Sequence, residues 1–194
     1  MKIYRLASLI DRVFNSVTNA AEAQPWVSWH SMAGLATVLN VDGSSLGNLG
    51  SSGFGGVLRH SDGSWLYGFA GHIGISSILH AELLALYYGL RVAWEKDYRY
   101  IICYSDYNLA IQLIAIGVSN WHLYATLIRN IQELLARAWT VQVCHTWREA
   151  NVVADFLAKM GARSNVDWQD VISPPDELQP LLQADASRVL YARR

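Results

Sequence analysis

Cysteine is scarce in this chain of 194 residues, which contains only Cys103 and Cys144. Two cysteines so far apart cannot form a disulfide framework or a CxxC metal site. Both lie in apolar stretches, so we expect buried free thiols in a protein kept in a reducing compartment. The chain is therefore expected to be intracellular, and nothing in the sequence separates a nuclear from a cytoplasmic address.

Net charge and long apolar runs are also lacking. The formal net charge is -1, so the chain as a whole does not attract nucleic acid or an anionic membrane, and local groups must hold any anionic partner. No apolar run reaches the ~18 residues of a transmembrane helix. The first residues carry charges and lack a small-residue cleavage site, which argues against a secretion signal. What remains, 52% hydrophobic and 16% charged residues, is typical of one globular domain with short appendages.

Hydrophobic periodicity divides the chain into a central domain and two flanks. Apolar residues at helical spacing predict an amphipathic helix at residues 3–20, followed by a proline-containing connector. Composition shifts mark a central domain at 36–162, preceded by the helix and connector at 1–35. Residues 163–194 form a tail with a Pro-Pro turn and a short helix expected near 177–183.

Strand and helix patterns follow one another in the central domain in an order that defines a fold class. Three strands come first, the last two joined by the turn signal Ser61-Asp62-Gly63, which predicts an antiparallel meander. The expected strands are 36–42, 53–60, 64–70, 99–106 and 139–147, and the expected helices are 77–96, 107–117, 122–138 and 148–161. This βββαβααβα order predicts an α/β (α+β) domain with a mixed five-stranded sheet and helices on both faces.

Four of the 16 acidic residues stand where such a fold would bring them together. Asp42 ends the first expected strand and Asp106 ends the fourth, at the carboxyl end where open sheets place their sites. Glu82 shares a helix face with small residues, and an acid on that inward face needs a partner charge or a metal. Asp155 lies among apolar residues of the last helix, one turn after Asn151.

The chemistry of this set follows if the first and fourth strands are neighbours. Carboxylates held so close repel one another and cannot all stay ionised without a cation, and we expect no Lys or Arg among them. Carboxylate oxygens suit Mg²⁺ or Mn²⁺, and a pair of such ions suits in-line displacement at phosphorus. The sequence thus favours a metal site formed by Asp42, Glu82, Asp106 and Asp155.

The stretch LNVDGSSLGNLGSSGFGGVLRH, residues 39–60, is unusually rich in glycine. A flexible linker is one interpretation, but both of its ends continue into strands. We therefore expect a strand, a loop and a strand, in which the glycines turn the backbone sharply and let a nucleic-acid strand approach.

Four separate motifs resemble those of type 1 ribonuclease H, in the same order. They are DGSSLGNLGSSGFG from Asp42, HAELLAL with Glu82, YSDYNLAI with Asp106, and CHTWREANVVADFLAKMG with His145 and Asp155. The last motif is most similar to the ribonuclease H-like domains of plant retroelements and their domesticated relatives. The resemblance covers about residues 38–162 and implies the strand order 3-2-1-4-5.

The resemblance also implies a function, namely metal-dependent endonucleolytic cleavage of the RNA strand of RNA–DNA hybrids. Two Mg²⁺ or Mn²⁺ ions would be held by the four acids, and His145 would assist proton transfer or product release. The residues expected to contact nucleic acid are Gly43, Ser44, Asn48, Ser77 and Arg148. We expect a monomer with no membrane partner, and double-stranded RNA is a second candidate substrate.

Departures from the family pattern keep other hypotheses open. Leu49 and Tyr107 replace a usual proline and a small hydroxyl residue, and Ile78 and Leu79 stand where bacterial members carry polar residues that touch the hybrid. No Lys/Arg-rich handle separates the two middle helices. One alternative is a catalytically weak or inactive remnant of a retroelement that still binds nucleic acid, and another is a fragment of a longer reverse-transcriptase polyprotein.

Overall fold

The structure is a computed structural model, which describes residues 26–27, 36–47, 49–186 and 191–192. The helix expected at 3–20 and Asn48 lie outside the described residues. Within the described part of the chain, no helix is both long enough and apolar enough to cross a membrane.

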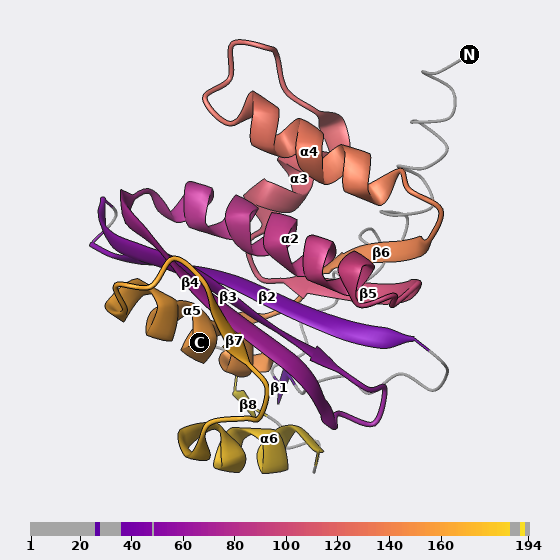
Figure 1. The fold of residues 1–194 in the computed structure, drawn as a ribbon, viewed down its shortest axis with the longest axis vertical. Coiled ribbons are helices and arrows are strands. Elements are labelled where there is room, and N and C mark those ends of the chain that lie inside the picture. The colour runs from indigo at the N-terminus through magenta and orange to yellow at the C-terminus, as the bar shows by residue number, and fades with distance from the viewer. Residues whose placement is uncertain (1–25, 28–35, 48, 187–190, 193–194) are drawn as a thin grey trace.

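A mixed sheet forms the centre of the domain (Figure 1). Its six strands are β2 (Thr37–Leu46), β3 (Gly50–Arg59), β4 (Trp65–Ser76), β5 (Tyr100–Ser105), β6 (Thr140–His145) and β7 (Gln169–Val171). They are arranged in the order β6-β5-β2-β3-β4-β7. β2, β3 and β4 form the expected antiparallel meander, whereas β5 runs parallel to β2 and β6 runs parallel to β5. Read from β4 to β6, the first five strands confirm the order 3-2-1-4-5.

The sixth strand is a correction, because the sequence predicted only five. β7 pairs antiparallel with β4, and Val171 lies opposite Gly68. The backbone groups along the outer edge of β4 need hydrogen-bond partners, and β7 supplies some of them. A strand of three residues is too short to show a period of two, so no hydrophobic pattern marks it in the sequence.

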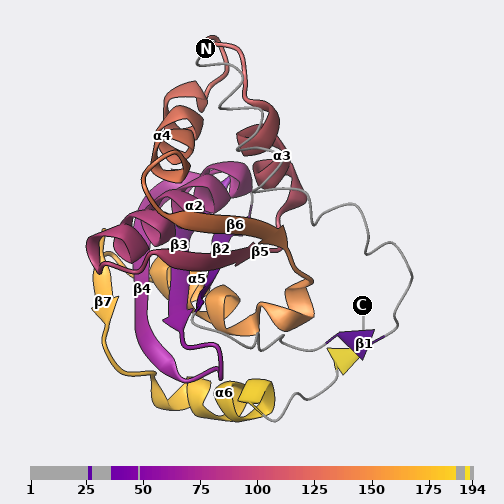
Figure 2. The same ribbon diagram turned by 90° about the vertical axis from the view of Figure 1, so that its right-hand side faces the viewer.

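Helices cover both faces of the sheet (Figures 1 and 2). One face carries α2 (Ile78–Glu95), α3 (Asn108–Ile116) and α4 (Ala125–Leu135), and the other carries α5 (Val152–Arg163). α2 begins after Ser77, whose hydroxyl accepts a hydrogen bond from the backbone N–H of His80. α3 ends at Gly117, as predicted, with a φ of 79°.

The last helix does not end at Gly161 as predicted, but continues to Arg163. Gly161 instead lies where α5 crosses β4, and a Cβ added to it would come within 2.5 Å of the carbonyl oxygen of Gly71. The glycine therefore allows close packing of helix and strand and does not stop the helix.

The glycine-rich stretch also differs from its prediction, because its glycines allow close helix packing rather than forming a long loop. β2 runs to Leu46 and β3 starts at Gly50, so most of the glycines lie within paired strands rather than in a long loop. A Cβ on Gly43 would lie 2.3 Å from the backbone nitrogen of Glu82, and one on Gly55 would lie 2.4 Å from the backbone nitrogen of Ala158. These glycines let α2 and α5 approach the two faces of the sheet.

The apolar interior has two parts. The larger lies between the sheet and α2 to α4, and it includes the free thiol Cys103, whereas the free thiol Cys144 is only partly buried. The smaller part joins β3 and α5 to the tail through buried side chains, namely Val57, Val153, Leu157, Val171 and Leu178.

Where the tail was expected to form a short helix, the chain has the 3-10 turn η2 (Asp176–Leu178) followed by α6 (Gln179–Ala186). Beyond them, β8 (Tyr191–Ala192) pairs antiparallel with β1 (Trp26–Val27), which joins segments from the two flanks. The pair forms a separate two-stranded sheet.

Candidate active site

Three carboxylates converge where β2 and β5 end. The parallel register places Asn40 opposite Tyr104, so two residues further along each chain Asp42 and Asp106 come side by side. Glu82 reaches the same point from the first turns of α2, which lies against the side-chain-free surface of Gly43. One carboxylate oxygen from each of Asp42, Glu82 and Asp106 lies within 4.8 Å of the others. The neighbouring strands that the acid pattern required are therefore present.

Burial and mutual repulsion set the charge state of this acid cluster, as we call Asp42, Glu82 and Asp106. Burial raises the pKa of Asp42 well above its ordinary value, and the nearby carboxylates of Glu82 and Asp106 raise it further. Burial and Asp106 likewise raise the pKa of Glu82, against the lowering effects of a backbone hydrogen bond from Gly43 and the charge of Arg148. The fully ionised cluster is thus unfavourable without a cation.

The oxygens of the acid cluster fit a divalent cation. Oε2 of Glu82 and Oδ1 of Asp106 are buried and have no hydrogen-bond partner among the described residues. Buried carboxylate oxygens of this kind are costly unless a donor or a metal meets them, and hard oxygen donors are the ligands that Mg²⁺ prefers. The donor set and its unsatisfied oxygens therefore suit Mg²⁺ or Mn²⁺.

Asp155 lies near the acid cluster but makes different contacts. Its charge contributes to the raised pKa of both Asp42 and Glu82. Its own carboxylate, however, forms ion pairs with Lys159 (2.6 Å) and Arg148 (3.4 Å). The expectation that no Lys or Arg stands among the four acids is therefore wrong. The spacing of four residues between Asp155 and Lys159 on one helix was the available signal for this pair.

One open pocket of about 990 Å³ contains the acid cluster, Asp155 and His145. Its other lining residues are Gly43, Ile78, Tyr107, Thr146, Trp147, Arg148, Glu149, Val152 and Lys159. Of these, Thr146, Trp147, Glu149, Val152 and Lys159 were not singled out as site residues in the sequence.

His145 is the last residue of β6 and is paired in register with Ser105 of β5. That register puts it beside the strand end that leads into Asp106. Its ring packs edge-on against the ring of Trp147, with centroids 5.5 Å apart. The histidine therefore lines the pocket next to the carboxylates without being one of the clustered acids.

The five residues expected to contact nucleic acid are not equivalent. Gly43 and Arg148 line the pocket. Ser44 is buried within β2, and Ser77 caps α2 while its hydroxyl shares a 2.8 Å hydrogen bond with that of Tyr124. The fifth, Asn48, lies outside the described residues.

Comparisons with known proteins agree with this geometry. Residues 40–161 match the sequence model of the reverse transcriptase-like family. A curated protein of Arabidopsis thaliana, named provisionally as a ribonuclease H protein, is 35% identical over 156 residues. That alignment covers 80% of this chain but only 25% of the relative, so the chain spans about a quarter of that protein's length.

Solved structures give the same result for the fold. RNase H1 of the halophilic archaeon Halobacterium salinarum is 25% identical, with a TM-score of 0.60 over 65% of this chain and 96% of that one. LC11-RNase H1, solved in complex with an RNA/DNA hybrid, is 21% identical, with a TM-score of 0.58 and the same coverage of 65% and 96%. With the family match over most of the central domain, these similarities lead to one assignment: the chain belongs to the reverse transcriptase-like family, and its domain has the type 1 ribonuclease H fold.

Proposed function

We propose that this domain is a metal-dependent endonuclease that hydrolyses the RNA strand of RNA–DNA hybrids. The observation that carries the proposal is the acid cluster, in which two buried carboxylates and Asp106 meet within 4.8 Å with oxygens left unsatisfied. Such a cluster lowers the stability of the fold unless a cation binds to it.

Asp42, Glu82 and Asp106 would hold the divalent ions, Mg²⁺ or Mn²⁺, and Asp155 would complete a two-ion site. When bound, a pair of such ions activates an attacking water and stabilises the leaving oxygen at a phosphodiester. Cleavage of this type leaves 5′-phosphate and 3′-hydroxyl ends. Asp155 forms ion pairs with Lys159 and Arg148, so its carboxylate must release these side chains before it can bind a metal ion.

The protein's other pocket residues have separate roles in this proposal. His145 would take or give a proton at its imidazole during hydrolysis or product release. The guanidinium of Arg148, whose side chain is 72% exposed and lines the pocket, would contact a phosphate of the strand. Gly43 lines the pocket beside Asp42, so its backbone would lie near the sugar–phosphate chain, while α2 occupies the space that a side chain would take.

We propose an RNA–DNA hybrid as the substrate because LC11-RNase H1 was solved with an RNA/DNA hybrid. A foamy viral protease-reverse transcriptase, of which 22% matches this fold, was also solved with one. Recognition of RNA rests on its 2′-hydroxyls and its wide minor groove. Double-stranded RNA shares those features and is the second substrate to test.

One observation favours a second candidate function, that of a domain which binds nucleic acid without cleaving it. The ion pairs of Asp155 with Lys159 and Arg148 already neutralise the fourth acid. A domain that keeps these pairs when nucleic acid is bound would have an incomplete metal site.

Cleavage of a labelled hybrid in Mg²⁺ tests the proposal. We expect cleavage of the RNA strand by the wild-type chain, and losses of at least ~100-fold in Asp42→Asn and Asp106→Asn. Asp176→Asn, which changes an exposed acid in η2, is the matched control and should cleave like the wild type. Activity that survives both cluster substitutions would refute the assignment.

Calorimetric titration with Mn²⁺ separates the two candidate functions. An active site should bind Mn²⁺ in the wild type and lose binding in Asp42→Asn. If the wild-type chain binds hybrid in a gel-shift assay but binds no Mn²⁺ and does not cleave the hybrid, the second candidate function, binding without cleavage, is correct.

A further inference from the structure

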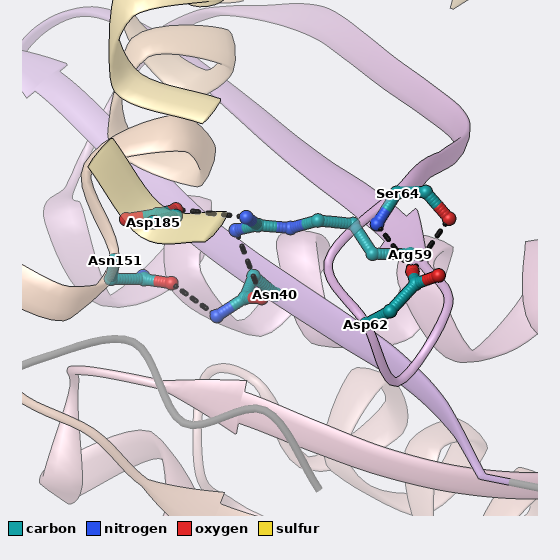
Figure 3. Close-up of polar contacts among 6 residues, drawn as sticks. All are labelled: Asn40, Arg59, Asp62, Ser64, Asn151 and Asp185. Carbon is teal, nitrogen blue, oxygen red and sulfur yellow. Dashed lines mark hydrogen bonds and ion pairs between the residues drawn. The ribbon is translucent and has the colours of Figure 1, made fainter. Parts of the chain in front are cut away.

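A continuous chain of buried polar side chains joins the tail to the centre of the sheet (Figure 3). Nη1 of Arg59 in β3 lies 2.8 Å from Oδ2 of Asp185 in α6, and its Nη2 donates to Oδ1 of Asn40 in β2 at 3.3 Å. The amide of Asn40 then donates to Oδ1 of Asn151 at 3.1 Å. All four residues are at most 2% exposed. We call them the polar chain.

At Asn151, the polar chain contacts the backbone next to two of the four acids, Asp42 and Asp155. Nδ2 of Asn151 donates to the carbonyl oxygen of Val41 at 3.0 Å, and Val41 is followed directly by Asp42. The backbone carbonyl of Asn151 accepts the N–H of Asp155 at 3.0 Å. One asparagine thus holds both the strand that carries Asp42 and the first turn of the helix that carries Asp155.

Packing alone does not explain these four residues. Burial lowers the pKa of Arg59 and raises the pKa of Asp185, each against the opposite effect of its partner, so desolvation disfavours both charges. A buried ion pair is often no more stable than apolar residues of the same volume, and apolar residues such as Val57 and Leu178 fill the adjacent interior. The polar chain differs from the surrounding apolar contacts because its hydrogen bonds follow one another from α6 toward the acid site. The last of them, made by Asn151, hold the backbone beside Asp42 and Asp155.

We propose that Arg59 and Asp185 are positioning residues, which act through Asn40 and Asn151 to hold Asp42 and Asp155 at a fixed separation. The proposal deepens the proposed function, on which its catalytic consequence rests. It assigns a role to α6, which lies after the segment that matches the family. Two carboxylates that share an ion must keep their spacing, and residues that support metal ligands have effects of ~10- to 100-fold on metal affinity.

Two variants break the polar chain and one tests for a general loss of stability. Asn40→Ala removes the central amide, and Asp185→Asn removes the charge opposite Arg59 while keeping the size of the side chain. Leu178→Ala is the matched control, because Leu178 is fully buried in the same tail but belongs to the apolar contact. All three should lower the Tm, so the readout must be local.

Amide hydrogen exchange at Gly43 and Asp155 supplies that readout, measured without metal in the chain of 194 residues. We expect exchange at both amides to speed up by about tenfold in Asn40→Ala and Asp185→Asn beyond what the loss of global stability explains. In Leu178→Ala, exchange should follow global stability alone. Equal behaviour of all three variants would overturn the proposal and reduce the polar chain to a tether for the tail.

Mn²⁺ titration of the same proteins measures the consequence for the site. We expect the dissociation constant to rise about tenfold in Asn40→Ala and Asp185→Asn, and to stay within about twofold of wild type in Leu178→Ala. A wild-type chain that binds no Mn²⁺ and cleaves no hybrid would refute the proposed function, and the exchange data would still decide whether the polar chain positions the acids.

Discussion

Nζ of Lys159 lies 2.6 Å from Oδ2 of Asp155, one turn away on α5. The acid cluster of Asp42, Glu82 and Asp106 includes no such contact with a basic side chain within 4.0 Å among the described residues, whereas Asp155 has two. Among the described residues, the four acids are therefore divided into three that form no ion pair and one, Asp155, that forms two.

Lys159→Gln should strengthen divalent-ion binding, because it removes a positive charge that competes with the ion for Asp155. The pair is partly exposed, with 38% of the lysine side chain accessible, so solvent screening keeps the effect small. We expect the Mn²⁺ dissociation constant to fall about fivefold, which corresponds to about 1 kcal/mol. Lys159→Arg keeps the charge and should bind like the wild type. Weaker binding by Lys159→Gln would mean that the lysine orients Asp155 toward the ion.

The stability of the metal-free chain should fall as the pH rises. Burial raises the pKa of Asp42 and Glu82 above their ordinary values of 3.8 and 4.5, so the folded state binds more protons than the unfolded state above that range. The stability that these groups contribute is full below about pH 4 and is lost as the pH rises through the raised values. Thermal unfolding in a chelator, from about pH 5 to pH 8, should show the Tm decreasing.

Asp42→Asn is the companion measurement for that pH dependence. The substitution removes one of the mutually repelling charges, so near neutral pH without metal it should raise the Tm by about 3 °C. In a chain of this size, that shift corresponds to about 1 kcal/mol of stability. Added Mn²⁺ should stabilise the wild type and leave the variant unchanged. A variant less stable than the wild type in chelator would contradict the unfavourable charge of the cluster.

Gly43→Ala should weaken Mn²⁺ binding, and Gly68→Ala is its control. The new Cβ at position 43 would lie 2.3 Å from the backbone nitrogen of Glu82, whereas the one at position 68 would lie 2.5 Å from the ring of Trp65. Both changes should lower stability, by up to about 3 kcal/mol. Only Gly43→Ala displaces the turn of α2 that carries Glu82, so it alone should weaken Mn²⁺ binding at temperatures where both variants remain folded. Equal binding by the two variants would mean that α2 can shift without moving the carboxylate.

His145→Ala should lower kcat on hybrid about 100-fold, the usual scale for loss of one proton-transfer group. It should leave Mn²⁺ affinity unchanged, because the histidine lines the pocket outside the acid cluster. His60→Ala, at an exposed position after β3, is the control. An unchanged kcat in single-turnover assays would remove His145 from the reaction.

The centre of the site could be predicted because its signals are local. An apolar strand that ends in an acid, and an acid on the small-residue face of a helix, each show their role within a few positions of Asp106 and Glu82. The fold then only has to bring strand ends together, which parallel pairing of β2 and β5 does. The role of the glycines was harder to predict, since Gly43 and Gly55 have no sequence mark that separates a loop from a helix contact.

The remaining contacts had no local signal. Arg59 and Asp185 are 126 positions apart, and no periodicity marks a buried ion pair between them. β7 is too short for an alternating pattern. For Asp155, the sequence showed both a metal-site motif and a lysine four residues later, and only the packed helix shows which of them its carboxylate contacts.

The tail should be needed for folding of the central domain. A chain that ends at Arg163 lacks β7, η2 and α6, so it exposes the apolar side chains of Val57 and Leu157 and leaves the buried charge of Arg59 without Asp185. Losing the partner of a buried ion pair alone costs about 3–5 kcal/mol. We expect this shorter chain to be unfolded or aggregated at 25 °C. The two losses together are comparable to the free energy of unfolding of a typical domain, about 5–15 kcal/mol. A chain that ends at Ala186 keeps these contacts and should unfold cooperatively in circular dichroism melts. A cooperative melt of the shorter chain at the same Tm would show that the tail is dispensable.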